Sequence, residues 1–220
     1  LSIPVLTSFG GKMSVRNDNQ NYCGLIGTMG LRPSNQNLNE CDLLIVLGSR
    51  LSWRQIRSRP DLFAQKSKII HVDIDKNELN QKIKTKYRYD VDVKELINKI
   101  LENKNSFKKN FKEWSKECVK NFKDYTLFTK KEIADNKKVN PYFFFKNLSN
   151  YMRANDVLVP DAGQNVMWAM QQTLIKKEQK IITSWGHSPM GYSLPASMGI
   201  AAINKFKGRV ICTIGDGGFQ

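Results

Sequence analysis

The chain has 220 residues, of which 40% are hydrophobic and 25% are charged, a composition that is ordinary for a soluble globular protein. No stretch approaches the ~18–20 uncharged apolar residues of a membrane-spanning helix, so the composition excludes a membrane protein. The formal net charge of +15 would suit a nucleic-acid binder, but 26 of the 35 basic residues are lysines and no motif interleaves arginine with aromatic residues. We therefore expect anionic small molecules as partners, and neither nucleic acid nor a membrane.

The four cysteines lie too far apart in the sequence to form a zinc or redox motif. Scattered thiols are typical of the reducing cytoplasm, where we place the protein. The first residues, LSIPVLTSFGGK, have neither a signal-peptide pattern nor an initiator Met. We expect the chain to be part of a longer protein.

Three apolar runs in the first third of the chain predict buried strands, at residues 3–8, 41–50 and 68–75. Together with helical spacing over 91–103, they are typical of a parallel sheet with helices on its faces. Ligands bind at the carboxyl ends of the strands in such sheets. Two of these strand ends carry polar residues, namely Ser49, Arg50, His71, Asp73 and Asp75.

Residues 102–138 differ in composition, with 11 lysines and neither glycine nor proline. Larger apolar side chains recur there every three or four residues, which predicts an amphipathic helix with a solvated basic face. They are Phe107, Phe111, Trp114, Cys118, Phe122 and Tyr125. We expect a helical linker; a helix lying on a membrane surface is the alternative, but no lipid motif accompanies it.

A second unit is predicted from residue 139 onward. Asn140 followed by Pro141 indicates the start of a helix. Strands are predicted at 156–163, 180–186 and 209–218, and a small, apolar helix packed against the sheet at 191–203. The predicted fold class is therefore α/β: two parallel-sheet, Rossmann-like three-layer units joined by a basic helical linker, the second unit truncated.

The last predicted strand ends in Gly215-Asp216-Gly217-Gly218. Glycines leave little steric bulk, so that backbone N–H groups can point at a phosphate. An aspartate at a strand end can hold Mg²⁺, which takes one or two carboxylates and completes its shell with phosphate oxygens and water. A plain turn is the alternative for such a motif in isolation.

Two further blocks accompany this motif, Gly163-Gln164-Asn165-Val166-Met167-Trp168 and Met190-Gly191-Tyr192-Ser193-Leu194-Pro195-Ala196. In this order and spacing, the blocks resemble those of the thiamine diphosphate-dependent enzymes of the acetolactate synthase group. Upstream, the segments 7–12, 24–30, 41–50 and 71–75 look like successive parts of the middle domain of that family.

The resemblance implies a middle domain at 1–101, a linker helix at 102–138 and the N-terminal part of a thiamine diphosphate-binding domain at 139–220. It also implies that the catalytic glutamate of the family and a second metal ligand lie outside this chain. No catalytic residue is therefore assigned, and we expect these 220 residues alone to be inactive.

The resemblance further implies roles for individual residues. Gly163, Gln164 and Asn165 would contact the diphosphate, together with Gly215, Gly217 and Gly218. Met190 would lie beneath the bent cofactor, the Ser188 carbonyl would accept from its amino group, and Asp216 would bind Mg²⁺. In the middle domain, Arg50, His71 and Asp73 would contact a flavin or nucleotide; whether that domain binds FAD, another nucleotide or nothing stays open.

The implied activity is that of a carboligase (a transferase) or decarboxylase (a lyase) acting on 2-keto acids such as pyruvate, in a homodimer or homotetramer. The chain departs from the family pattern at His187-Ser188-Pro189, at Gly218 in place of Ser and at Met29 in place of His. These changes would suit a divergent carboligase, for example in sugar biosynthesis. An inactive nucleotide-binding fragment is the other alternative.

Overall fold

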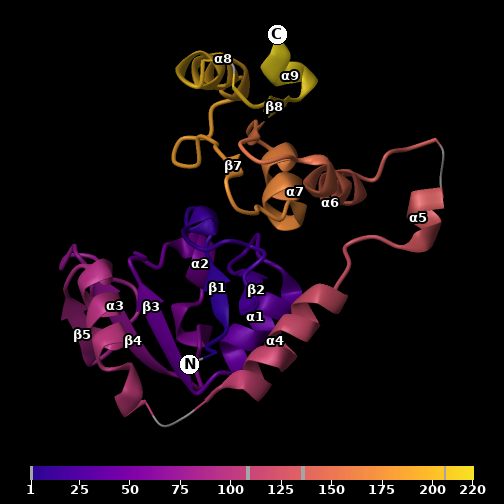
Figure 1. Cartoon of the computed structure of the whole chain (residues 1–220). Helices are drawn as coiled ribbons and strands as arrows, with labels where there is room; N and C mark the ends of the chain where they lie inside the picture. Colours follow the sequence, from indigo (N-terminus) through magenta and orange to yellow (C-terminus); the bar gives the residue numbers. More distant parts are fainter. Residues whose placement is uncertain (1, 108–109, 135–136, 206) are drawn as a thin grey trace. The chain divides into compact units, whose positions relative to one another are not determined.

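A computed structural model describes residues 2–107, 110–134, 137–205 and 207–220 (Figure 1). The chain divides into two compact units, which are described separately. Unit 1 comprises Leu1–Ser8 and Cys23–Phe122, and unit 2 comprises Phe9–Tyr22 and Lys123–Gln220.

Unit 1 contains a three-stranded parallel sheet in the order β3-β4-β5 and a two-stranded sheet of β1 and β2. The strands are β1 (Val5–Thr7), β2 (Tyr22–Leu25), β3 (Leu43–Leu47), β4 (Lys68–Asp73) and β5 (Tyr87–Asp90). The predicted strands at 3–8, 41–50 and 68–75 are confirmed. Because β3 and β4 are parallel and in register from Leu43↔Lys68 to Leu47↔Val72, their carboxyl ends meet at one edge.

The α-helices of unit 1 are α1 (Arg32–Glu40), α2 (Trp53–Ile56), α3 (Val93–Glu102) and α4 (Lys112–Asp124), the last of which runs two residues into unit 2. Three short 3-10 helices also occur in the described ranges, η1 (Lys12–Ser14), η2 (Pro60–Leu62) and η3 (Lys104–Ser106). The core of unit 1 joins α1 and α2 to the sheet through Leu38, Val46, Leu51, Ile56, Ala64, Ile69 and Ile83. Asp92 starts the predicted helix α3 by accepting a hydrogen bond from the Lys94 backbone.

The single helix predicted over 102–138 is wrong in extent. The described residues there form α4 and a separate short helix, α5 (Lys130–Ala134), while Phe107 and Phe111 precede α4 and are exposed. Only the central part of the predicted stripe packs as expected, because Cys118 is buried against Cys23 with Trp114 alongside. Figure 1 shows α4 beside α1, where the Asn37 side chain donates to the Cys118 carbonyl.

Unit 2 contains a three-stranded parallel sheet in the order β7-β6-β8. Its strands are β6 (Val157–Pro160), β7 (Lys180–Ile181) and β8 (Val210–Thr213), at the three predicted places. Its longer helices are α6 (Pro141–Tyr151), α7 (Gln164–Gln172) and α8 (Ser193–Ile203), and α9 (Asp216–Phe219) follows β8. Asn140 caps α6 as predicted, accepting from the backbone of Tyr142 and Phe143.

Helix α8 differs from the prediction of a tightly packed apolar helix. Its buried residues are Ser193 and Ser197, whereas Leu194, Met198 and Ile203 are exposed. The packing of small residues against the sheet is thus restricted to the serine face of the helix, and Ser197 turns its hydroxyl to the Ser193 carbonyl.

The two three-stranded sheets confirm the predicted α/β class with parallel strands. Within the described ranges, no helix combines the length and the apolar character that a bilayer crossing requires. The predicted continuous domains at 1–101, 102–138 and 139–220 stay a prediction.

Candidate functional site

The carboxyl ends of β6 and β8 meet at one edge of the sheet in unit 2. The strands are in register from Val157↔Val210 to Pro160↔Thr213, and the Asp161 backbone donates to the Thr213 carbonyl at 2.8 Å. The segment that follows each strand therefore starts from the same edge. This is the edge at which parallel sheets bind ligands.

Asp161 joins the segment after β7 to this edge. Its side chain is 2% exposed, and it accepts from the Gly191 backbone at 2.9 Å and from the Ser193 backbone at 3.0 Å. These two charge-assisted hydrogen bonds, donated by backbone N–H groups, hold both the loop that leads into α8 and the first residue of that helix. The prediction did not assign a role to Asp161; an aspartate directly after a buried strand was the available signal.

Glycines bring the segment after β8 into the same place. A Cβ atom on Gly218 would lie 2.5 Å from Asp161 Oδ2 and 3.0 Å from the Gly191 nitrogen. Gly191, with φ of 83°, has its own Cβ position 3.0 Å from the Gly218 carbonyl oxygen. The structure thus brings three separate segments into direct contact around one buried carboxylate.

Helix α7 is attached to the same edge through Asn165, whose side chain donates to the Thr213 carbonyl. Gly163 precedes the helix with φ of 87°, a conformation that favours glycine. Gln164 is exposed at the start of the helix. The Thr213 hydroxyl is buried and has no hydrogen-bond partner among the described residues.

The remaining glycines leave open space at this edge. Among the described residues, and apart from chain neighbours and the backbone of the same helix, no atom lies within 4 Å of a Cβ built on Gly163, Gly215 or Gly217. A ligand could therefore approach the backbone closely at these positions, which is the property that glycine-rich phosphate sites require. Asp216 begins α9 beside them, with its side chain exposed.

The loop before α8 carries the two other predicted cofactor contacts. Met190 is 73% exposed, and Ser188 adopts a φ of 50°, with its hydroxyl donating to the Trp185 carbonyl at 3.3 Å. Over the ranges that the structure describes, no three His, Cys, Asp or Glu side chains gather closely enough to hold a metal ion. Asp216 would therefore contribute a single carboxylate, which is within the habit of Mg²⁺.

The opposite ends of β6 and β8 are held by an ion pair. Asp156 is buried and accepts from Arg209 Nη2 at 2.5 Å, Arg209 Nε at 3.2 Å and the Arg153 backbone at 2.7 Å. Burial by itself would raise the pKa of Asp156, but the hydrogen bonds from Arg209 and the backbone outweigh it and hold the pKa below its usual value. This pair fixes the register that sets the edge at the other end.

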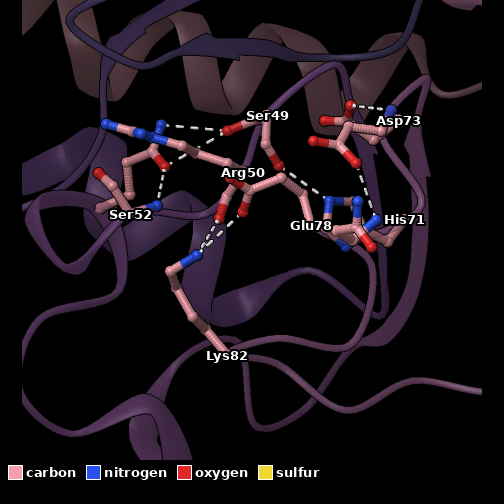
Figure 2. Close-up of polar contacts among 10 residues, drawn as sticks. Ser49, Arg50, Ser52, His71, Asp73, Glu78 and Lys82 are labelled. Atoms are coloured by element: carbon pink, nitrogen blue, oxygen red, sulfur yellow. Dashed lines mark hydrogen bonds and ion pairs between the residues drawn. The ribbon is translucent and has the colours of Figure 1, made fainter.

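A second group of predicted residues lies at the carboxyl edge of β3 and β4 in unit 1 (Figure 2). The His71 ring is 2% exposed, and its Nε2 lies 2.8 Å from the Ser49 carbonyl oxygen. His71 Nδ1 is buried and has no hydrogen-bond partner among the described residues. Asp73 is also buried and accepts from the Asp75 backbone at 3.0 Å.

Arg50 lies in the loop after β3, with its side chain exposed. Figure 2 shows Lys82 reaching toward this loop, where its amine donates to the Arg50 carbonyl at 3.1 Å and pairs with Glu78 at 3.1 Å. The three predicted contacts, Arg50, His71 and Asp73, thus come from adjacent strand ends. His71 and Asp73 also hold the local backbone, which for His71 is the structural role that a histidine at a strand end often has.

The fold and these edges define an α/β protein of the type that binds ligands where parallel strands end. Residues 1–100 match the family model described as thiamine pyrophosphate enzyme, central domain. Residues 161–220 match the model described as thiamine pyrophosphate enzyme, C-terminal TPP binding domain. The chain belongs to the thiamine pyrophosphate enzymes, as its sequence blocks predicted.

Curated relatives include large subunits of acetolactate synthase. The chain is 33% identical over 220 residues to that of Lactococcus lactis subsp. lactis (strain IL1403), covering 99% of this chain and 37% of the relative. It is 34% identical over 226 residues to that of Cyanidium caldarium, covering 100% and 37%. It is 29% identical over 218 residues to the isozyme 2 large subunit of Escherichia coli (strain K12), covering 99% and 38%. The chain thus spans little more than a third of the length of these relatives.

Proposed function

We propose that the whole protein is a thiamine diphosphate- and Mg²⁺-dependent carboligase or decarboxylase that acts on a 2-keto acid such as pyruvate. The observation that carries the proposal is the meeting of three segments around Asp161, because it gathers the glycine backbone, Asn165 and Asp216 at one edge. The names of the relatives supply the reaction class.

The residues at this edge fit the cofactor. Open backbone at Gly163, Gly215 and Gly217 would receive the diphosphate, with Gln164, Asn165 and Gly218 beside it, and the unpartnered Thr213 hydroxyl adds a donor. Asp216 would hold Mg²⁺ against the phosphate oxygens. The exposed side chain of Met190 would support the bent cofactor, and the Ser188 carbonyl would accept from its amino group.

Bound thiamine diphosphate supplies the carbon nucleophile and the electron sink for loss of CO₂. The part played by this chain is to bind and orient: glycine backbone against the phosphates, one carboxylate on the metal, and apolar surface from Met190.

We further propose that the middle domain spans 1–101, that 102–138 links it to the cofactor domain at 139–220, and that the protein acts as a homodimer or homotetramer in the cytoplasm. The proposed location rests on the scattered cysteines of the sequence, which are typical of a reducing compartment.

Release of CO₂ from 2-keto acids tests this proposal. The whole protein, supplied with thiamine diphosphate and Mg²⁺, should release CO₂ from at least one of a series of 2-keto acids, and chelation of the metal should stop the release. The carbon product then separates acetolactate synthesis from a divergent carboligation, to which the departures at His187, Pro189 and Met29 point. Absence of CO₂ release from every acid in the series would overturn the proposal.

A second proposal concerns the edge of β3 and β4, where we infer a flavin or other nucleotide site. It is supported by the buried, unpartnered Nδ1 of His71 and by the exposed Arg50 side chain, a suitable partner for phosphate. A flavin would give the purified protein an absorbance band near ~450 nm, as expected of a flavin cofactor. A band that persists at full strength in the double variant Arg50→Met, His71→Leu would place the flavin elsewhere.

A further inference from the structure

The segment between β1 and β2 belongs to unit 2, although both of its flanking strands contribute to unit 1. We call residues Phe9–Asn17 the strap. The strap lies within the residues that match the central-domain model, yet its hydrogen bonds reach residues of the cofactor-binding half of unit 2.

Lys12 caps the carboxyl end of α7. Its side chain is 2% exposed, and its amine donates to the Met170 carbonyl at 2.7 Å. This carbonyl is in the last turn of the helix, where carbonyls lack intrahelical donors. The expected donor, the Leu174 backbone, bonds instead to the Ser149 hydroxyl. A lysine amine at this end of a helix can donate to a carbonyl that has no intrahelical partner.

Asn17 holds the chain just beyond the helix. The Ile175 backbone donates to its side-chain oxygen at 3.1 Å, and the Asn17 backbone donates to the Ile175 carbonyl at 2.9 Å. Its side-chain amide also donates to the Lys12 carbonyl at 3.3 Å, which ties the two anchors together. Both side chains are buried, so water cannot replace these bonds without opening the strap.

Phe9 connects the strap to the loop before α8. Its ring stacks on that of Trp185, with centroids 4.5 Å apart and an interplanar angle of 17°. The Ser188 hydroxyl donates a hydrogen bond to the Trp185 carbonyl, and Met190 lies two residues after Ser188. The strap therefore contacts two of the three segments that form the proposed cofactor edge.

We propose that the strap holds α7 and the Trp185 loop in the cofactor-binding arrangement before the cofactor arrives, with Lys12 and Phe9 as positioning residues. This inference rests on the proposed function for the identity of the ligand. Preorganisation lowers the cost of ordering on binding, so losing it weakens binding rather than the reaction of the bound state. Neither Lys12 nor Phe9 is placed in contact with the cofactor.

Titration of the whole protein with thiamine diphosphate at saturating Mg²⁺, followed by tryptophan fluorescence, tests the inference. Lys12→Met removes the donor at similar length, and Lys176→Met is the control, because Lys176 is exposed in the same unit. Loss of one buried hydrogen bond should raise the half-saturating concentration about tenfold. The value of kcat at saturating cofactor should change by no more than about twofold, since bound cofactor restores the arrangement.

Phe9→Leu provides the second arm should Lys12→Met fail to fold, and it should also raise the half-saturating concentration by several-fold. If the folded variants reach half-saturation at the same cofactor concentration as the wild type and Lys176→Met, the inference about the strap is overturned. The proposed function is unaffected by that result. A loss confined to kcat, with half-saturation unchanged, would also overturn it. Absence of any titration in the wild type would overturn the proposed function and this inference together.

Discussion

At the scale of the residue, the proposed cofactor edge depends on the close approach of the Gly218 backbone to the Asp161 carboxylate. The Asp161 carboxylate is buried, and both of its oxygens accept hydrogen bonds from backbone N–H groups. Its role is therefore to hold the backbone rather than to bind a metal ion. Gly218 fits only because it lacks a side chain. This contact explains why a glycine occupies position 218.

Substitution of Gly218 tests this contact. Gly218→Ala would place a Cβ atom 2.5 Å from Asp161 Oδ2 and 3.0 Å from the Gly191 nitrogen, so backbone must move. We expect a loss of about 1–3 kcal/mol in the free energy of unfolding, as for other overpacked sites. Gly217→Ala is the matched control, since its Cβ would meet nothing within 4 Å and neither glycine has a positive φ. Equal denaturant midpoints for the two variants would contradict the geometry.

The sequence predicted most of the residues at this edge but not how they are held. Gly163, Asn165 and Asp216 follow apolar runs, and the carboxyl ends of parallel strands share one edge, so the pattern predicts that these residues lie at the same edge. The role of Asp161 depends on backbone groups 30 and 32 residues further on. Such long-range partners have no signature in local spacing, which is also why the bond from His71 to the Ser49 carbonyl was not foreseen.

At the scale of the element, α7 is fixed at both ends. Asn165 attaches its first turn to β8, and Lys12 caps its last turn from the strap. The amine of Lys12 is buried, and this burial lowers its pKa from the ordinary value to about 7. The helix that carries the proposed diphosphate contacts is therefore capped by an amine that is largely neutral above this pH.

The lowered pKa of Lys12 makes stability depend on pH in a defined direction. Between about pH 7 and the ordinary lysine pKa near 10.4, the unfolded chain binds a proton that the folded chain does not, so stability rises with pH. The slope from this single group is at most about 1.4 kcal/mol per pH unit, and it vanishes below about pH 7.

Denaturant unfolding at pH 7, 8 and 9 tests this dependence. The difference in unfolding free energy between the wild type and Lys12→Met should increase with pH over this range, while Lys176→Met should follow the wild type. All other groups titrate alike in these proteins, so their contributions cancel in the difference. Curves that stay parallel across the range would show that Lys12 keeps its proton when folded.

The predictions of helices and strands were wrong where polar and apolar residues mix. Strand β5, Tyr-Arg-Tyr-Asp, has no apolar run and was missed; it is recognised only by its pairing with β4. The lysine-rich helix ends at Asp124, before a segment of aromatic and threonine residues of low helix propensity, and the next helix begins at Lys130. The capped helices α3 and α6 were placed well, because Asp92 and Asn140 act locally.

At the scale of the whole molecule, the division into units does not follow the order of the sequence. The segment Phe9–Tyr22, which contains the strap, belongs to unit 2, whereas the chain before it and the chain from Cys23 to Phe122 belong to unit 1. Local sequence patterns cannot predict this assignment, because the hydrogen-bond partners of Lys12 and Asn17, Met170 and Ile175, each lie 158 residues further along the chain. Most of the lysines among the described residues are exposed, and they contribute to the net charge of +15.

The central claim is that the edge of β6 and β8 binds thiamine diphosphate through a magnesium ion held by Asp216. Calorimetric titration of the whole protein with thiamine diphosphate, with and without Mg²⁺, tests it most directly. Binding should require Mg²⁺ and should weaken at least about tenfold in Asp216→Asn, the loss expected for a charge-assisted contact. The exposed-carboxylate control Glu178→Gln should bind as the wild type does. Binding that ignores Mg²⁺, or an Asp216→Asn variant that binds with unchanged affinity, would contradict the account.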